Sequence, residues 1–154
     1  MSYVNSVLQP GETVRAIGRL HWIVFVRAFV LLVVGIVVMV YAQYLSSEQA
    51  SRLVTLIGWL VVALSGLLFL HAWFVRWITE LAITNHRVIY KRGFLNRHTV
   101  EMNMDKVETV DVDQSILGRM LDFGTIRVRG TGQGIERLER IATPIILRNA
   151  IIAR

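Results

Sequence analysis

Two uninterrupted apolar stretches fill most of the first half of the chain. Residues 22–44 contain a single charged side chain, Arg27, and residues 53–75 contain none. A helix rises about 1.5 Å per residue, so roughly 20 residues cross a hydrocarbon layer about 30 Å thick. Both stretches are long enough to do this. They predict two transmembrane helices in an integral membrane protein whose second half is exposed to water.

The connection between the stretches, residues 45–52, is so short that the two predicted helices must be antiparallel neighbours. Arg15 and Arg19 precede the first stretch, and Arg76 follows the second. Basic residues favour the cytoplasmic side, so the protein is expected to be multi-pass with both termini in the cytoplasm. The predicted organisation is a cytoplasmic N-terminal segment at 1–21, a two-helix hairpin at 22–76 and a cytoplasmic domain at 77–154.

The first stretch is expected to be retained rather than cleaved as a signal peptide, because it is longer than a signal core and 21 residues precede it. Small side chains on one face of the second predicted helix would let a neighbouring helix approach closely. The sequence leaves open whether that neighbour is the first helix or another subunit. The candidate packing residues are Thr55, Gly58, Val62 and Gly66.

The second half changes to short segments in which apolar and polar residues alternate, which is typical of strands. Such segments occur near 80–84, 87–91, 97–104, 109–113 and 125–129. Turn residues separate them every 8 to 12 positions, a spacing that predicts an antiparallel meander closing toward a small barrel or sandwich. Ser115 is expected to cap a short helix. Thr143 followed by Pro144 predicts the start of a C-terminal helix that closes the open end.

The segment ELAITNHRVIYKRGFL at 80–95 and the segment VDVDQSILGRMLDFG at 110–124 resemble the bacterial pleckstrin-homology-like (PH-like) domain of two-helix membrane proteins. Residues 8–12 and 19–22 resemble the same family. This resemblance implies a PH-like fold attached to a hairpin in the bacterial cytoplasmic (inner) membrane. It also implies no particular activity, because the family has no common catalytic motif.

Catalytic chemistry is not indicated by the composition. Cysteine is absent, and the four histidines at 21, 71, 86 and 98 do not follow a metal-ligand spacing. We find no nucleophile with an accompanying base and acid. The chain is therefore predicted not to be an enzyme and to need no cofactor or metal. Its net charge of +6 beside a membrane favours contact with anionic lipids over nucleic acid.

Four residues, 76–79, join the second apolar stretch to the first strand, so the domain is expected to lie against the inner headgroup layer. Because tethering already localises the domain, the leading hypothesis is protein–protein interaction. The domain would be a scaffold, a self-assembling unit or an accessory subunit of a larger membrane complex. An anionic-lipid sensor is the alternative, and a transporter or channel component is a weaker one. The candidate headgroup contacts are Arg87, Lys91, Arg92, Arg97, Arg127 and Arg129.

Overall fold

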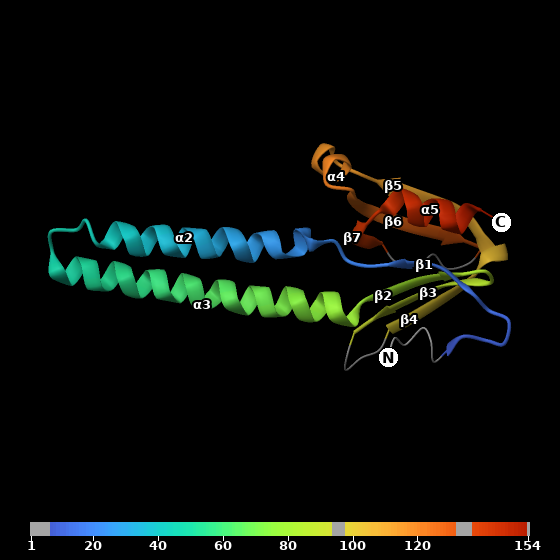
Figure 1. The fold of residues 1–154 in the computed structure, drawn as a ribbon, viewed down its shortest axis with the longest axis horizontal. Helices are drawn as coiled ribbons and strands as arrows, with labels where there is room; N and C mark the ends of the chain where they lie inside the picture. Colours follow the sequence, from blue (N-terminus) through green and yellow to red (C-terminus); the bar gives the residue numbers. More distant parts are fainter. Residues whose placement is uncertain (1–6, 94–97, 132–136, 154) are drawn as a thin grey trace. The chain divides into compact units, whose positions relative to one another are not determined.

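The computed structural model describes residues 7–93, 98–131 and 137–153 (Figure 1). The chain divides into two compact units. The first, here called the hairpin unit, is Trp22–Val75, and the second, the sandwich unit, combines Met1–His21 with Arg76–Arg154. The segment before the hairpin unit and the segment after it therefore form one compact unit.

The hairpin unit consists of two long helices. A short 3-10 turn, η1 (Trp22–Phe25), leads into α2 (Val26–Ala42), and α3 (Glu48–Ile78) returns. Both helices are long and apolar enough to cross a membrane, and their apolar side chains are mostly exposed. The predicted stretch 53–75 lies within α3, and the helix begins five residues earlier and ends three residues later than this stretch.

Glycines allow the backbones of α2 and α3 to approach closely. A Cβ placed on Gly35 would lie 2.8 Å from Cγ2 of Val62 and 3.3 Å from the carbonyl oxygen of Gly58, and one on Gly58 would clash with Met39. The helix that Gly58 and Val62 contact is thus α2 of the same chain. Gly66 has no atom within 4 Å of a Cβ position, and Thr55 donates its hydroxyl hydrogen to the carbonyl of Ser51 within α3.

The first sheet of the sandwich unit has the order β1-β2-β3-β4, with every pair antiparallel. Its strands are β1 (Val14–Gly18), β2 (Glu80–Thr84), β3 (Arg87–Arg92) and β4 (His98–Asn103). β1 was not expected from the sequence. It pairs Val14 with Thr84 and Gly18 with Leu81, residues that the entire hairpin unit separates in the sequence. Central position explains why four of the five β2 residues are buried.

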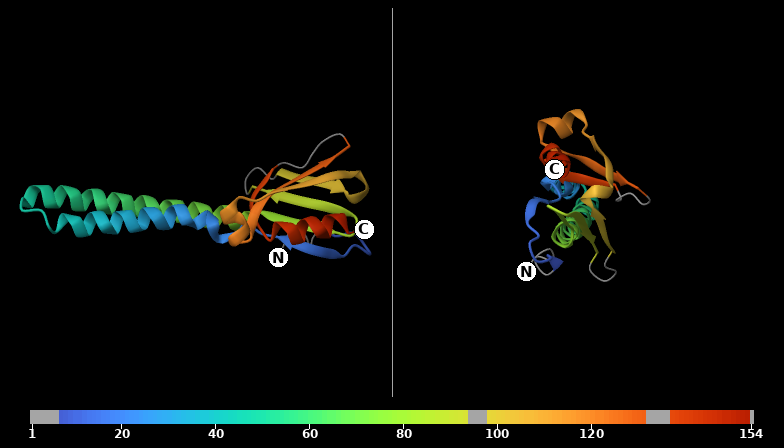
Figure 2. Two further views of the ribbon diagram at one scale, coloured as in Figure 1. Left: turned by 90° about the horizontal axis from the view of Figure 1, so that it is seen from above. Right: turned by 90° about the vertical axis from the view of Figure 1, so that its right-hand side faces the viewer.

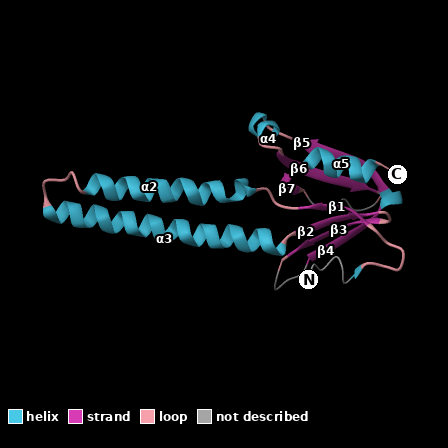
Figure 3. Ribbon diagram, viewed as in Figure 1, coloured by secondary structure: helices cyan, strands magenta, loops and turns pink. Residues whose placement is uncertain are grey.

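The second sheet has the order β5-β6-β7 and is also antiparallel (Figure 3). A 3-10 turn, η2 (Met104–Lys106), leads into β5 (Val107–Asp113), and β6 (Phe123–Gly130) and β7 (Leu138–Ala142) follow. Between β5 and β6 lies the short helix α4 (Ile116–Met120), where the Ser115 hydroxyl accepts a hydrogen bond from the Gly118 N–H, as predicted.

The C-terminal helix α5 (Pro144–Ile152) packs against β5, β6 and β1 (Figure 2). The fold is a two-sheet sandwich, and the sheets are not closed into a barrel, so the barrel alternative of the sequence analysis is not formed. An isolated antiparallel bridge between Leu20 and Ile141 joins the segment after β1 to β7. The core consists of fully buried aliphatic side chains from both sheets and α5: Leu81, Ile83, Val88, Ile126, Val128, Leu138, Ile141 and Leu147.

Candidate functional site

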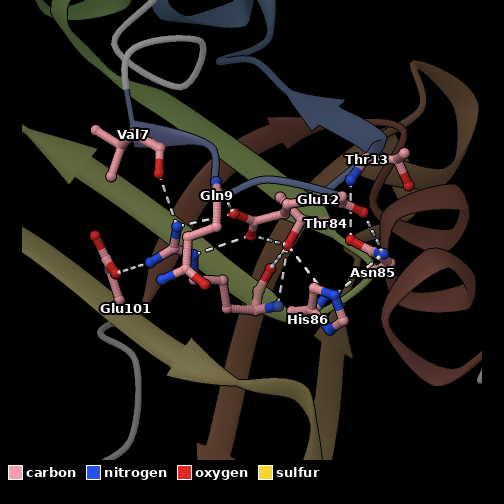
Figure 4. Close-up of polar contacts among 10 residues, drawn as sticks. Val7, Gln9, Glu12, Thr13, Thr84, Asn85, His86 and Glu101 are labelled. Atoms are coloured by element: carbon pink, nitrogen blue, oxygen red, sulfur yellow. Dashed lines mark hydrogen bonds and ion pairs between the residues drawn. The ribbon is translucent and has the colours of Figure 1, made fainter.

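Arg87, the first residue of β3, is held in a largely buried network of ion pairs and hydrogen bonds, and Figure 4 labels its partners Val7, Glu12 and Glu101. Its Nε and one terminal nitrogen donate to the two carboxylate oxygens of Glu12 at 3.0 and 2.8 Å. The same terminal nitrogen donates to the carbonyl of Val7 at 2.8 Å, and the other donates to Glu101 at 2.7 Å. Only 12% of the Arg87 side chain and 1% of the Glu12 side chain are exposed. Arg87 has little left to offer a lipid headgroup.

The carboxylate of Glu12 is satisfied on every side. The Thr84 hydroxyl donates to it at 2.7 Å, and the backbone N–H of Gln9 donates at 2.9 Å. Hydrogen bonds from the Arg87 guanidinium are the main reason that the pKa of Glu12 falls from 4.5 to about 2, although burial opposes the shift. Asn85 adds a hydrogen bond by accepting from the N–H of Thr13. This network fastens the segment before β1 to the turn between β2 and β3.

The other candidate headgroup contacts are divided between the two sheets. Lys91 is half-buried on β3, and Arg97 and the side chain of Arg92 lie outside the described residues. Arg127 and Arg129 lie two residues apart on β6. Each pairs with an aspartate of β5: Arg127 with Asp113 at 3.2 Å and Arg129 with Asp111 at 3.5 Å. Lipid contact by these residues stays a prediction.

An open groove of about 530 Å³ lies between β5 and α5. We call it the β5–α5 groove. Because β5 pairs only with β6 among the described residues, its other edge has no strand beside it. Five consecutive residues of and after β5 border the groove, and side chains from α4, β6 and α5 complete it. The lining is Val110, Asp111, Val112, Asp113, Gln114, Arg119, Arg127, Ile145 and Arg148.

The groove carries an excess of positive charge. Both aspartates that line the groove are paired with arginines: Asp113 with Arg127, and Asp111 with Arg129. Within the described ranges, Arg119 and Arg148 form no ion pair, and both are exposed. The Nε of Arg127 is a buried donor that has no hydrogen-bond partner among the residues that the structure describes. The groove therefore suits an extended segment with acidic or phosphate-like groups.

The sequence names Arg127 as a candidate headgroup contact and does not single out Arg119 or Arg148, and it predicts no groove at this place. Arg119 lies inside the 110–124 segment, and Arg148 lies in the predicted C-terminal helix, far from the other two arginines in the sequence. Nothing local in the sequence signals that α5 places Arg148 beside β5. Over the described residues, no three His, Asp or Glu side chains are grouped as a metal site would require.

A two-sheet antiparallel sandwich with a C-terminal helix packed on it defines the class of PH-like modules. The sequence pattern of the family described as Bacterial PH domain matches residues 16–149, and the chain belongs to this family. The match runs from within β1 to within α5 and includes both apolar helices. Among curated proteins and among solved structures, no match to the chain is found.

Proposed function

We propose that the chain is a non-catalytic, membrane-anchored PH-like interaction module at the cytoplasmic face of a bacterial inner membrane. It would work as a scaffold, a self-assembling unit or an accessory subunit of a membrane complex. The observation that carries this proposal is the β5–α5 groove, which runs along an unpaired strand edge in a domain that the family match assigns to a typically non-catalytic module.

The pairing of β1 with β2 supports the membrane placement. β1 precedes the two apolar helices in the sequence and β2 follows them, yet the two strands pair in one sheet. A sheet cannot be assembled across a bilayer, so the two segments belong on the same side. Two crossings satisfy this condition. The basic residues that flank the apolar helices then favour the cytoplasmic side.

The groove offers a recognised way to hold a partner. An extended segment can add to a free strand edge, where main-chain hydrogen bonds supply affinity and side-chain pockets supply selectivity. Arg119 and Arg148 would attract acidic side chains of that segment, while Val112 and Ile145 would contact apolar ones. Confinement to a membrane raises the effective concentration of any partner in the same membrane, so modest affinity is sufficient.

Photo-crosslinking in native membranes tests this proposal. A photoreactive amino acid would replace Ile145, which lines the groove, or Ile152, which lies on the same helix outside it. The two side chains are 50% and 51% exposed, so they are matched for accessibility. Adducts at position 145 and none at 152 support the groove as a docking site. Equal adducts at both positions, or a protein that runs at its monomer mass of 17.5 kDa in mild detergent without any other protein, contradict the proposal.

Anionic-lipid sensing is the second candidate, and the unpartnered Nε of Arg127 beside Arg119 and Arg148 favours it. A lipid phosphate in the groove could accept hydrogen bonds from the exposed guanidiniums of Arg119 and Arg148. The test is native mass spectrometry of the protein extracted with its lipids. Replacing Arg119 and Arg148 by Gln should remove bound anionic lipid, whereas Arg137→Gln, which changes an exposed arginine outside the groove, should not. Equal lipid occupancy in all three proteins argues against a lipid role for the groove.

A further inference from the structure

Helix α4 presents apolar side chains to solvent at the junction between β5 and β6. Ile116 and Met120 are 81% and 76% exposed, which makes them the most exposed large hydrophobic residues among the described residues of the sandwich unit. Leu117 lies between them and is also exposed. We call these three residues the α4 tip. Grouped apolar side chains with this exposure are typical of surfaces that contact a partner protein or a membrane.

The exposure of the α4 tip is built into the fold and does not result from a loose loop. The side-chain amide of Gln114 donates to the carbonyls of Gly118 and Phe123 at 3.3 and 3.1 Å. The Ser115 hydroxyl caps the N–H of Gly118 at 3.1 Å. A Cβ on Gly118 would lie 2.6 Å from the carbonyl oxygen of Phe123, so the helix sits directly on the start of β6. The tip is a fixed projection.

Contacts inside the sandwich unit connect the segment after α4 to His21, the last residue of this unit before the hairpin unit begins. Phe123, just after α4, stacks on His21 with 5.2 Å between the ring centroids. The His21 N–H donates to the carbonyl of Arg140 at 2.7 Å, which fixes the position of this residue. His21 is followed directly by Trp22, the first residue of the first helix that could cross a membrane. Arg76, near the end of the second such helix, is close enough to influence His21 electrostatically.

We propose that the α4 tip inserts into the interfacial layer of the membrane that the two long helices cross, and so fixes the sandwich unit against the lipid. The occupant is the bilayer, because Phe123, which follows α4 by three residues, stacks on His21, and the residue after His21 starts a candidate span. Arg119 within α4 and Arg76 near His21 supply positive charge for anionic headgroups around the apolar side chains. This inference rests on the membrane placement proposed above.

The chain contains no cysteine, so a single introduced cysteine can carry an environment-sensitive nitrobenzoxadiazole label without other changes. Met120→Cys places the label on the tip. Ile152→Cys is the control, because it is exposed and lies at the far end of α5, whose first residue, Pro144, is near Gly124. The labelled full-length protein is reconstituted into vesicles of phosphatidylethanolamine and phosphatidylglycerol. Emission is measured with a lipid that carries a shallow doxyl quencher, and separately with aqueous iodide.

The label at position 120 should lose roughly half of its emission to the doxyl lipid and little to iodide, and the label at 152 should show the reverse. Iodide quenching at 120 equal to that at 152 would overturn the inference. Protection of the 120 label from both quenchers would also overturn it, because protein rather than lipid would then cover the tip.

Measurements are made on vesicles washed at alkaline pH, which removes proteins that are not embedded. Loss of the protein in this wash contradicts the membrane placement, and with it the insertion of the α4 tip. Retention of the protein together with iodide quenching at 120 contradicts the tip insertion alone. The two failures are therefore distinguishable.

Discussion

Glu12 and Arg87 show how a single ion pair can define the fold of a segment. Arg87 looks like a surface cation in the sequence, and Glu12 lies 75 positions away, so neither residue signals the other locally. The structure removes both side chains from solvent and supplies each with additional hydrogen bonds. Loss of either partner would leave a buried charge or acceptor unsatisfied, which is costly.

The substitution Glu12→Gln should destabilise the sandwich unit by about 2 kcal/mol, because Arg87 loses one of its two carboxylate partners while remaining buried. Hydrogen exchange of the β2 and β3 amides in the full-length protein reports this change. Glu139→Gln, which breaks an exposed pair with Arg137, is the matched control and should have almost no effect. Equal loss of protection in both variants would show that the buried Glu12–Arg87 pair stabilises the sandwich unit no more than the exposed Glu139–Arg137 pair does.

Acid should weaken the sandwich unit through the same residue. The pKa of Glu12 is about 2 in the fold and 4.5 without it, so the unfolded chain binds the proton more readily. The stabilisation is complete above about pH 4.5 and is lost as the pH falls toward about 2. Amide protection of β2 should therefore decline over this range in the wild-type protein. The decline should be smaller in Glu12→Gln; an identical decline would assign the acid sensitivity to other carboxylates.

His21 makes a second pH-dependent contribution. Burial, together with the nearby positive charge of Arg76, lowers the pKa of His21 below 6.5. The neutral ring is thus the native form, and stability should fall as the pH drops below about 6.5, where the unfolded chain begins to take up the proton. His21→Phe keeps an aromatic ring against Phe123 and removes the titration. Thermal unfolding at about pH 8 and about pH 5.5 should show a smaller difference for this variant than for the wild type.

At the scale of elements, hydropathy and alternation were sufficient for most of the architecture. The apolar helices follow from uninterrupted local composition, and β2 to β6 follow from short-range alternation. β1 was missed because its five residues acquire meaning only when β2 lies beside them. The β5–α5 groove was missed for a similar reason, since it exists only once α5 packs against β5.

The small residues of α3 should differ sharply in their tolerance of substitution. Gly58→Leu introduces a side chain where even a Cβ meets Met39 of α2, so the helix pair should be destabilised by about 1–3 kcal/mol. Gly66→Leu faces open space and should leave the pair intact. Spin-label distances between α2 and α3 in reconstituted protein measure the effect. A separation that changes equally in both variants would contradict the packing; a lower oligomer mass for Gly66→Leu alone would indicate that this position faces a second copy.

At the scale of the whole molecule, the sandwich unit is discontinuous in sequence. Residues before the hairpin supply β1 and Glu12, and residues after it supply every other strand. The hairpin is therefore inserted into the fold of the sandwich unit and is not appended to it. The family match extends across both apolar helices in agreement with this arrangement.

A fragment of residues 76–154 should consequently fail to form a stable sandwich, because β2 loses its neighbour β1, and Arg87 loses Glu12. A chain in which residues 1–21 are joined to 76–154 by a flexible Gly/Ser linker should fold. Amide chemical-shift dispersion in NMR spectra distinguishes the two. A well-dispersed spectrum from the 76–154 fragment alone would show that the N-terminal strand is dispensable.

The pairing of β1 with β2 also sets an order of events during synthesis. Glu12 must wait for Thr84, its hydrogen-bond partner 72 positions later, so the first strand leaves the ribosome long before its neighbour exists. The ribosome synthesises both apolar helices, α2 and α3, between these two strands. Contacts between distant parts of a chain form slowly, so under the proposed membrane placement both helices would enter the bilayer before β1 and β2 pair. If the proposed two-crossing topology holds, β1 would stay unpaired until the second helix returns β2 to the same face of the membrane, and correct topology would be a precondition for completing the sheet.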